Sequence, residues 1–187
     1  MHFEKQNAVH ATLKRLARRL DELGVDYAIV GGMALFFHGF RRFTEDVDIL
    51  VNRETLERVH QNLEGRGYVK PFEKSKNLRD TVHGVKIDFL VTGQFPGDGT
   101  PGPISFPDPF GSTVEMDGMR FLSLEKLIEL KLASGRAPHR LGDLNDVQRI
   151  IQAKNLPVEF ADKLDPSVRD SFRERWQAAQ QATKDDY

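Results

Sequence analysis

The sequence predicts an α/β (α+β) fold, in which a mixed, twisted sheet is flanked by helices and followed by a helical C-terminal part. Up to residue 122, short apolar runs of strand length alternate with amphipathic segments of helical period. Beyond residue 122 the apolar side chains recur almost entirely at helical spacing. A chain of 187 residues can bury its own core, so we expect a core at 1–122 and a helical region at 123–187 to pack as one compact unit.

The spacing of apolar residues places each element of the first part. A helix is predicted at 5–24, because Leu13, Leu16 and Leu20 recur at steps of three and four, and Gly24 can end it. Shorter apolar runs and their flanking glycines predict, in chain order, a strand at 27–30, one or two helical turns at 33–38, a strand at 46–51, a helix at 53–64, a hairpin over 79–91 that turns at 83–84, and a short strand within 115–122.

Helices dominate the second part. Over 123–134, Ser123 can accept a hydrogen bond from the first turn, and Leu127 and Ile128 belong to an apolar face. Further helices are predicted at 143–154 and at 167–183, the last anchored by Phe172 and Trp176.

The run 92–113 is rich in glycine and proline and has no periodicity. We therefore expect it to form a long loop. Loops of this length are uncommon in compact domains unless they have a function or are mobile, so its role stays open.

Composition excludes several classes of protein. A net charge of −1 argues against a strongly basic nucleic-acid binder and against an acidic disordered tail. The absence of cysteine excludes disulfides, thiolate zinc sites, iron–sulfur clusters and a cysteine nucleophile. No segment approaches 18 consecutive apolar residues, and the first residues lack the apolar stretch of a signal peptide. We therefore expect a cytoplasmic protein with no membrane partner.

Two acids at the start of a predicted strand are the most informative feature. In DVDILV, Asp46 and Asp48 point to one side while Val47 and Ile49 point to the other. Two neighbouring carboxylates on a largely apolar strand are costly unless something neutralises them. Magnesium does so readily, because it prefers hard oxygen ligands and is usually held by one or two carboxylates.

A third acid and a pair of glycines extend this pattern. Asp88 interrupts the apolar run VKIDFLV, and it joins the other acids if the two strands are neighbours. Three carboxylates can hold two cations, and Asp88 is then a natural general base for an incoming hydroxyl. Gly31 and Gly32 allow close approach of backbone to a phosphate where a helix begins. A lone D-x-D is most often a solvated strand end, but the whole combination predicts a phosphate-and-metal site.

The segment YAIVGGMALFFHGFRRFTEDVDILV resembles the signature of the DNA polymerase β-like nucleotidyltransferase superfamily. That signature has a Gly-Gly or Gly-Ser turn, a spacer, an acid-x-acid pair and a third acid on a later strand. Within the superfamily, the sequence is most similar to the abortive-infection type toxins and their uncharacterised bacterial relatives. This closer similarity rests on R-F-T-x-D-x-D at 42–48 and on LEKLIELKLASGRAPHRLGDLNDV, and the whole resemblance covers about 25–155.

The resemblance implies a nucleotidyltransferase fold and a reaction. A nucleoside monophosphate would pass from a magnesium-bound nucleoside triphosphate, such as ATP, to an acceptor hydroxyl, with release of pyrophosphate. Asp46, Asp48 and Asp88 would be the catalytic, metal-binding acids, holding two Mg²⁺ ions, with Mn²⁺ as an alternative. Gly31 and Gly32 would bind the triphosphate.

The resemblance also implies nucleotide contacts for several other residues, and for some of them a structural role is an alternative. Arg42 either meets phosphate or is a solvated cation, and Thr44 either belongs to the nucleotide site or shapes the turn into the strand. Lys131 matches the family's helical lysine and would face phosphate. Asp143 and Asp146 match the acids that follow it, although Asp143 could equally cap its own helix.

The acceptor and the partners stay open. Relatives of the toxin type act on transfer RNA ends, and other branches modify small antibiotics or proteins, so a tRNA and a cognate antitoxin are both candidate partners. The local candidate for RNA binding is the basic face of the first helix, although a solvated face is the preferred interpretation. That face comprises Lys14, Arg15, Arg18 and Arg19. The alternative function is a non-catalytic nucleotide- or partner-binding protein of the same fold, such as a toxin–antitoxin component.

Overall fold

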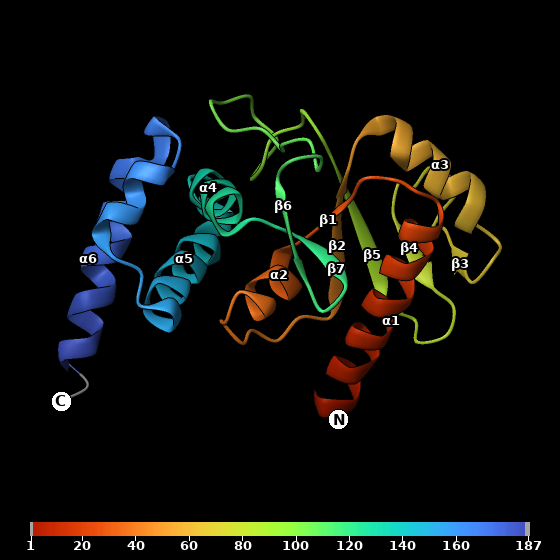
Figure 1. Cartoon of the computed structure of the whole chain (residues 1–187), viewed down its shortest axis with the longest axis horizontal. Helices are drawn as coiled ribbons and strands as arrows, with labels where there is room; N and C mark the ends of the chain where they lie inside the picture. Colours follow the sequence, from red (N-terminus) through yellow and green to blue (C-terminus); the bar gives the residue numbers. More distant parts are fainter. Residues whose placement is uncertain (1, 186–187) are drawn as a thin grey trace. The chain divides into compact units, whose positions relative to one another are not determined.

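The computed structural model describes residues 2–185 of the chain (Figure 1). Contacts within the chain divide it into two compact units. The first comprises Met1–Ala34, Arg42–Thr92 and Pro107–Leu122, and the second comprises Leu35–Arg41, Gly93–Phe106 and Ser123–Tyr187. The packing of 123–187 on 1–122 as one unit stays a prediction.

A sheet of seven strands forms the centre of the first unit. The strands are β1 (Ala28–Val30), β2 (Asp46–Val51), β3 (Tyr68–Val69), β4 (Leu78–Asp80), β5 (Lys86–Val91), β6 (Thr113–Met116) and β7 (Met119–Leu122). Their order in the sheet is β3-β4-β5-β2-β1-β7-β6. Strand β2 pairs parallel with β5 and antiparallel with β1, and β1 pairs parallel with β7. This mixed sheet with its helices confirms the predicted fold class.

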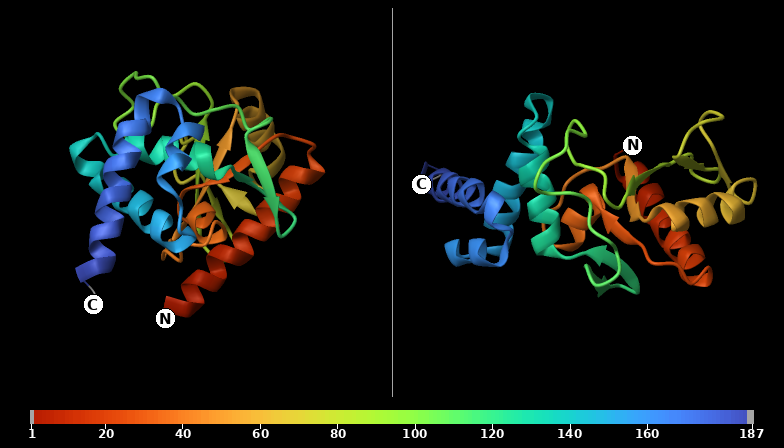
Figure 2. Two further views of the ribbon diagram at one scale, coloured as in Figure 1. Left: turned by 60° about the vertical axis from the view of Figure 1, so that its left-hand side comes forward. Right: turned by 90° about the horizontal axis from the view of Figure 1, so that it is seen from above.

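Two long helices cover one face of this sheet. The helices that belong wholly or partly to the first unit are α1 (His2–Glu22), α2 (Gly31–Phe37) and α3 (Arg53–Leu63). Helix α1 contacts β2 and β7, and α3 contacts β5 (Figures 1 and 2). On α3 the ring of His60 lies 6.2 Å from the ring of Phe89 on β5, and on α1 Thr12 donates a hydrogen bond to Asp80 on β4.

Strand alternation then defines the other face of the sheet. Val47, Ile49 and Phe89 are fully buried on the side of α1 and α3. The side chains between them in the sequence therefore point to the opposite face, which carries the predicted acids. An apolar strand face under the helices and an acidic opposite face are what the pattern DVDILV predicted.

The second unit is mainly helical. Its helices are α4 (Leu124–Ser134), α5 (Leu141–Lys154) and α6 (Arg169–Asp185), with short 3₁₀ turns η1 (Pro138–Arg140), η2 (Val158–Lys163) and η3 (Pro166–Val168). Ser123 accepts a hydrogen bond from the backbone of Lys126 and so caps α4, as predicted. Phe172 is buried against Phe160, and the Trp176 indole donates a 2.9 Å hydrogen bond to the Leu156 carbonyl. These contacts confirm the two predicted anchors of α6.

Two differences from the predicted elements have local causes. Residues 115–122 were expected to hold one strand, but β6 and β7 form a hairpin there. Its turn is made by Asp117 and Gly118, which have φ angles of 51° and 70°, and Asp-Gly is a favoured pair for such a turn. The two-residue strand β3 was not predicted, because so short a run has no periodicity. Among residues 2–185, none of the helices is both long and apolar enough to cross a membrane.

Candidate active site

Asp46, Asp48 and Asp88 lie on one face of two adjacent parallel strands. In the pairing of β2 with β5, Asp48 is the direct partner of Asp88, and Asp46 is the direct partner of Lys86. Residues in register on neighbouring strands point to the same side of the sheet, so the three carboxylates share the face opposite to α1 and α3. The strand pairing on which the third acid depended is therefore present.

Gly31 brings the backbone directly against Asp48. Val30 on β1 pairs with Asp48, so the next residue, Gly31, lies beside the Asp48 side chain. A Cβ atom at Gly31 would lie 2.8 Å from the Asp48 carboxyl carbon, and Gly31 has a φ of +64°. Both the close approach and the positive φ require glycine at this position.

Gly32 makes a second close contact, with Thr44. A Cβ atom at Gly32 would lie 2.8 Å from the Cβ atom of Thr44. The Thr44 hydroxyl donates a 3.1 Å hydrogen bond to the backbone carbonyl of Asp46. Thr44 therefore shapes the entry into β2, which is the second of the two roles expected for it, and its role toward a nucleotide stays a prediction.

Lys86 is a member of the site that the sequence analysis missed. Its ammonium group donates a 2.9 Å hydrogen bond to Oδ2 of Asp88. This hydrogen bond, with the charges of Asp88, Asp46 and Asp48, raises the pKa of Lys86 above its usual range, against the opposing effect of burial. Lys86 is two residues before Asp88 in the same strand, so alternation alone could have placed both on one face.

The electrostatics of this face favour a cation. Partial burial raises the pKa of Asp46, and the charges of Asp88 and Glu45 raise it further, while Lys86 opposes them. A raised carboxylate pKa means that the ionised form lacks compensation from its surroundings. A bound cation would supply that compensation.

The donor set fits a hard divalent cation in its chemistry. Three carboxylates supply oxygen ligands of the kind that magnesium and manganese prefer. Oδ1 of Asp88 is buried without a hydrogen-bond partner in residues 2–185, so one ligand atom has no competing contact there. As the side chains stand, no group of three or more histidine or acidic side chains in that range is placed to hold a metal ion. A metal ion that takes Oδ2 of Asp88 as a ligand must displace the Lys86 ammonium.

Lys131 and the acids that follow it form a cluster within the second unit. The Lys131 ammonium lies 2.7 Å from Asp143 Oδ1 and 2.8 Å from Asp146 Oδ2, and the Lys131 side chain is 12% exposed. Ser134 donates a 2.6 Å hydrogen bond to Asp143 Oδ2, and Arg140 donates one of 3.0 Å to the same oxygen. This network joins α4 to α5.

The contacts of this cluster bear on two of the predicted roles. Helix α5 begins at Leu141, with Arg140 in the cap position, so Asp143 lies inside the first turn and does not cap the helix. Lys131 contacts two carboxylates, which is a complete structural role for a buried ammonium. Its predicted contact with phosphate, and that of Asp143 with the nucleotide, stay predictions.

The remaining cations that the sequence suggested lie on other segments of the chain. Arg42 is exposed on the segment that leads into β2. On α1, Lys14 pairs with Asp117, Arg15 pairs with the buried Asp80, and Arg19 pairs with Glu22. Three of the four cations expected as a basic face are therefore engaged within the chain.

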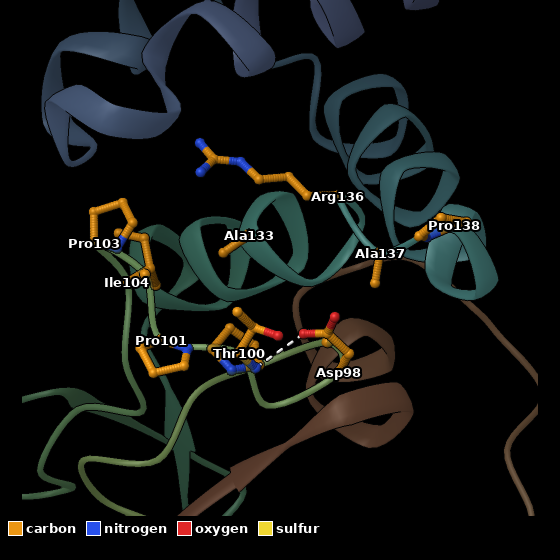
Figure 3. Close-up of a pocket in the computed structure, with 12 residues that line it drawn as sticks. Asp98, Thr100, Pro101, Pro103, Ile104, Ala133, Arg136, Ala137 and Pro138 are labelled. Atoms are coloured by element: carbon orange, nitrogen blue, oxygen red, sulfur yellow. Dashed lines mark hydrogen bonds between the residues drawn. The ribbon is translucent and has the colours of Figure 1, made fainter.

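The loop predicted at 92–113 helps to form a small pocket within the second unit. Residues 96–104 and 133–138 enclose about 250 Å³, and most of the lining is proline, glycine, alanine and isoleucine. The Asp98 carboxylate accepts a 2.9 Å hydrogen bond from the backbone N–H of Thr100 in its own loop (Figure 3). The Arg136 guanidinium donates a 2.8 Å hydrogen bond to the Ser167 carbonyl. Both charged side chains of the lining therefore have a hydrogen-bond partner within the second unit.

Comparisons with known proteins show the fold. No family model and no curated protein matches the sequence. The chain is similar to the solution structure of the antibiotic-resistance factor ANT(2'')-Ia, with a TM-score of 0.56 and 17% identity over 98% of this chain and 99% of that one. A crystal structure of ANT(2'')-Ia in complex with adenylyl-2''-tobramycin gives a TM-score of 0.56 and 16% identity over 91% and 99%.

A third solved structure gives the same result. An antigenic nucleotidyltransferase-like protein from Paracoccidioides brasiliensis matches with a TM-score of 0.51 and 16% identity, over 89% of this chain and 93% of that one. At these identities the likeness shows the fold alone. The chain therefore has a nucleotidyltransferase-like fold, as the motif resemblance implied, and its place in the DNA polymerase β-like superfamily stays a prediction. The closer similarity to abortive-infection toxins stays a prediction.

Proposed function

We propose that the protein is a metal-dependent nucleotidyltransferase, which moves a nucleoside monophosphate from a nucleoside triphosphate to an acceptor hydroxyl and releases pyrophosphate. The observation that carries this proposal is the register of β2 and β5, which puts Asp46, Asp48 and Asp88 on one face beside the backbone of Gly31. Structural likeness to nucleotidyltransferases supports it at the level of fold.

The chain's own residues would act mainly by positioning and by charge. Asp46, Asp48 and Asp88 would hold Mg²⁺ or Mn²⁺, which supplies neutralisation of the triphosphate charge and polarisation of its oxygens. The acceptor oxygen forms a bond to the α-phosphorus while the bond to pyrophosphate breaks. The acceptor proton would pass to the carboxylate of Asp88, which shares the face of the two other acids.

Among the acceptors, a small molecule with hydroxyl groups is the one we propose, with ATP as the donor. The structure of ANT(2'')-Ia was determined with an adenylylated aminoglycoside, and that protein matches this chain over nearly its whole length. A tRNA would need phosphate contacts from lysine and arginine. Three of the four cations on α1 that could supply them are paired with acids of the chain itself.

One observation favours the non-catalytic alternative. The Lys86 ammonium already neutralises Asp88, at 2.9 Å from its Oδ2. A protein that binds nucleotides or a partner without turnover could keep this arrangement. The two functions differ in whether nucleotide binding depends on magnesium and on the acid pair.

The test is calorimetric binding of each nucleoside triphosphate, with and without Mg²⁺. We expect magnesium-dependent binding of ATP to the wild type and its loss in Asp46→Asn/Asp48→Asn. Asp117→Asn is the matched control, because Asp117 is an exposed acid paired with Lys14 away from this face, and it should bind like the wild type. Binding that needs neither magnesium nor the acid pair would favour the alternative.

Turnover is tested separately by pyrophosphate release with ATP and a panel of aminoglycosides and other polyhydroxyl compounds. We expect Asp88→Asn to lower the rate by at least about a hundredfold, because it removes a ligand and the proton acceptor together. Magnesium-dependent binding without turnover on any acceptor would leave the nucleotide site in place and direct the search to another acceptor class.

A further inference from the structure

Lys86 is the cation that the acidic face already carries. Its ammonium lies 2.9 Å from Oδ2 of Asp88, and it is the direct partner of Asp46 across the two strands. The side chain of Lys86 is 41% exposed, and that of Asp88 is 23% exposed. One oxygen of Asp88 is thus held by an ammonium, while the other is buried without a partner in residues 2–185.

An ammonium and a divalent cation compete for such a carboxylate. Both are attracted by the same charge, and they repel each other when they are close. The four-carbon stem of lysine is flexible, and the half-exposed position of Lys86 allows its ammonium to leave without disturbing the sheet. Exchange of one cation for the other is therefore open to this site without unfolding any element.

We propose that Lys86 is an internal counter-ion that holds Asp88 while no divalent cation is bound and releases it when one binds. This inference rests on the proposed function. It predicts that a divalent cation alone binds weakly. A cation that arrives with a triphosphate has an advantage, because the phosphate oxygens attract the released ammonium.

The site would then fill with metal and nucleotide together. In the resting protein the ammonium of Lys86 neutralises one of the three carboxylates, which lowers the electrostatic cost of the acidic face when no ion is bound. This role makes Lys86 a positioning residue for Asp88 and for metal binding, and it leaves the chemistry to the three acids.

Metal binding without nucleotide gives a readout that does not depend on activity. We would titrate the full chain with Mn²⁺ and measure the concentration of free Mn²⁺ from its electron paramagnetic resonance signal. Lys86→Gln removes the charge and should bind Mn²⁺ about three- to tenfold more tightly than the wild type, as expected for loss of one partly exposed competing ion pair. Lys86→Arg keeps the charge and should show no such gain.

A matched control separates this local effect from a general change in charge. Lys14→Gln removes the same charge from another ion pair of the first unit, with Asp117, and should leave Mn²⁺ affinity unchanged. Thermal unfolding without metal verifies that each variant is folded. We expect the stabilisation by saturating Mn²⁺ to be larger for Lys86→Gln than for the wild type.

The outcomes distinguish the inference from the proposed function. If the wild type binds Mn²⁺ and Lys86→Gln binds it equally or more weakly, the counter-ion role is wrong and the metal site stands. If only Lys86→Gln binds the ion, the counter-ion role is supported in its strongest form. If neither protein binds Mn²⁺, with or without ATP, both the inference and the metal-dependent function fail.

Discussion

Gly31 and Asp48 are so close that the backbone of one fixes the side chain of the other. A Cβ atom on Gly31 would lie 2.8 Å from the carboxyl carbon of Asp48, and the Gly31 φ of +64° disfavours any other residue. The contact follows from the pairing of Val30 with Asp48, which places the end of β1 beside the acidic face. Glycine is therefore required at position 31 both for the backbone turn and for the placement of the Asp48 carboxylate.

We expect Gly31→Ala to destabilise the protein by about 2–4 kcal/mol, since it adds a collision to the cost of a positive φ. Gly65→Ala is the control that measures the cost of the positive φ without the collision, because Gly65 has a φ of +74° and nothing within 4 Å of an added Cβ. That control should cost about 1 kcal/mol. Urea unfolding of both variants measures the difference. Equal losses would mean that Asp48 moves aside without cost.

A second prediction concerns the buried carboxylate of Asp80, which joins α1 to the hairpin that leads into β5. Asp80 accepts a 2.7 Å hydrogen bond from Thr12 and pairs with Arg15. Asp80→Asn keeps the shape but leaves Arg15 without its counter-ion. We expect the free energy of unfolding to fall by about 2–3 kcal/mol, less than for a fully buried pair because Arg15 is partly exposed.

The control for Asp80→Asn is again the exposed Asp117, whose replacement by Asn should change stability by less than about 0.5 kcal/mol. Chemical denaturation of the two variants under the same conditions makes the comparison. If Asp80→Asn were as mild as the control, the contacts of Thr12 and Arg15 with Asp80 would contribute little to holding α1 on the sheet.

Elements that depend only on local sequence could be predicted almost completely. Strand β2 has the predicted bounds of 46–51, because the alternation of acids with apolar residues is contained in the strand itself. The Asp-Gly turn of β6 and β7 is also a local signal, because Asp117 and Gly118 between two apolar runs predict two strands in place of one. These elements need no information from distant residues.

Relationships between strands are different, because they depend on register. The pairing of Asp48 with Asp88 joins residues 40 positions apart through α3 and the β3–β4 pair, and the sequence does not state the register. The same register places Lys86, which contacts Asp88, directly beside Asp46. For Lys131, family resemblance indicated a phosphate contact, whereas the structure shows which carboxylates of α5 lie nearest to it.

The Lys131 cluster gives a third prediction. Lys131→Met removes the cation that two largely buried carboxylates share, and we expect a loss of about 3 kcal/mol in stability. Adding Asp146→Asn should recover part of that loss, because one of the two carboxylates that lost the Lys131 ammonium is then neutral. A thermodynamic cycle of the two single variants and the double variant measures the coupling. A double variant that loses the sum of both single effects would contradict the shared ion pair.

The fourth prediction is a dependence of stability on acid pH. Burial alone raises the pKa of Asp143, but the charge and hydrogen bond of Lys131, with Ser134 and Arg140, lower it below its ordinary value of 3.8. The unfolded chain then binds the proton more readily than the folded chain, so this contribution is present above the ordinary pKa. It is lost as the pH falls through the lowered pKa of the folded state.

Asp143→Asn should therefore destabilise the protein most at neutral pH, and its difference from the wild type should shrink as the pH falls from about 5 to about 2. Urea unfolding across that range measures the difference at each pH. Asp162→Asn is the control, because Asp162 is an exposed acid that pairs with Arg173 in the same unit, and its effect should stay within about 0.5 kcal/mol throughout. A difference for Asp143→Asn that is constant or grows in acid would show that its carboxylate is not stabilised in the ionised form by Lys131.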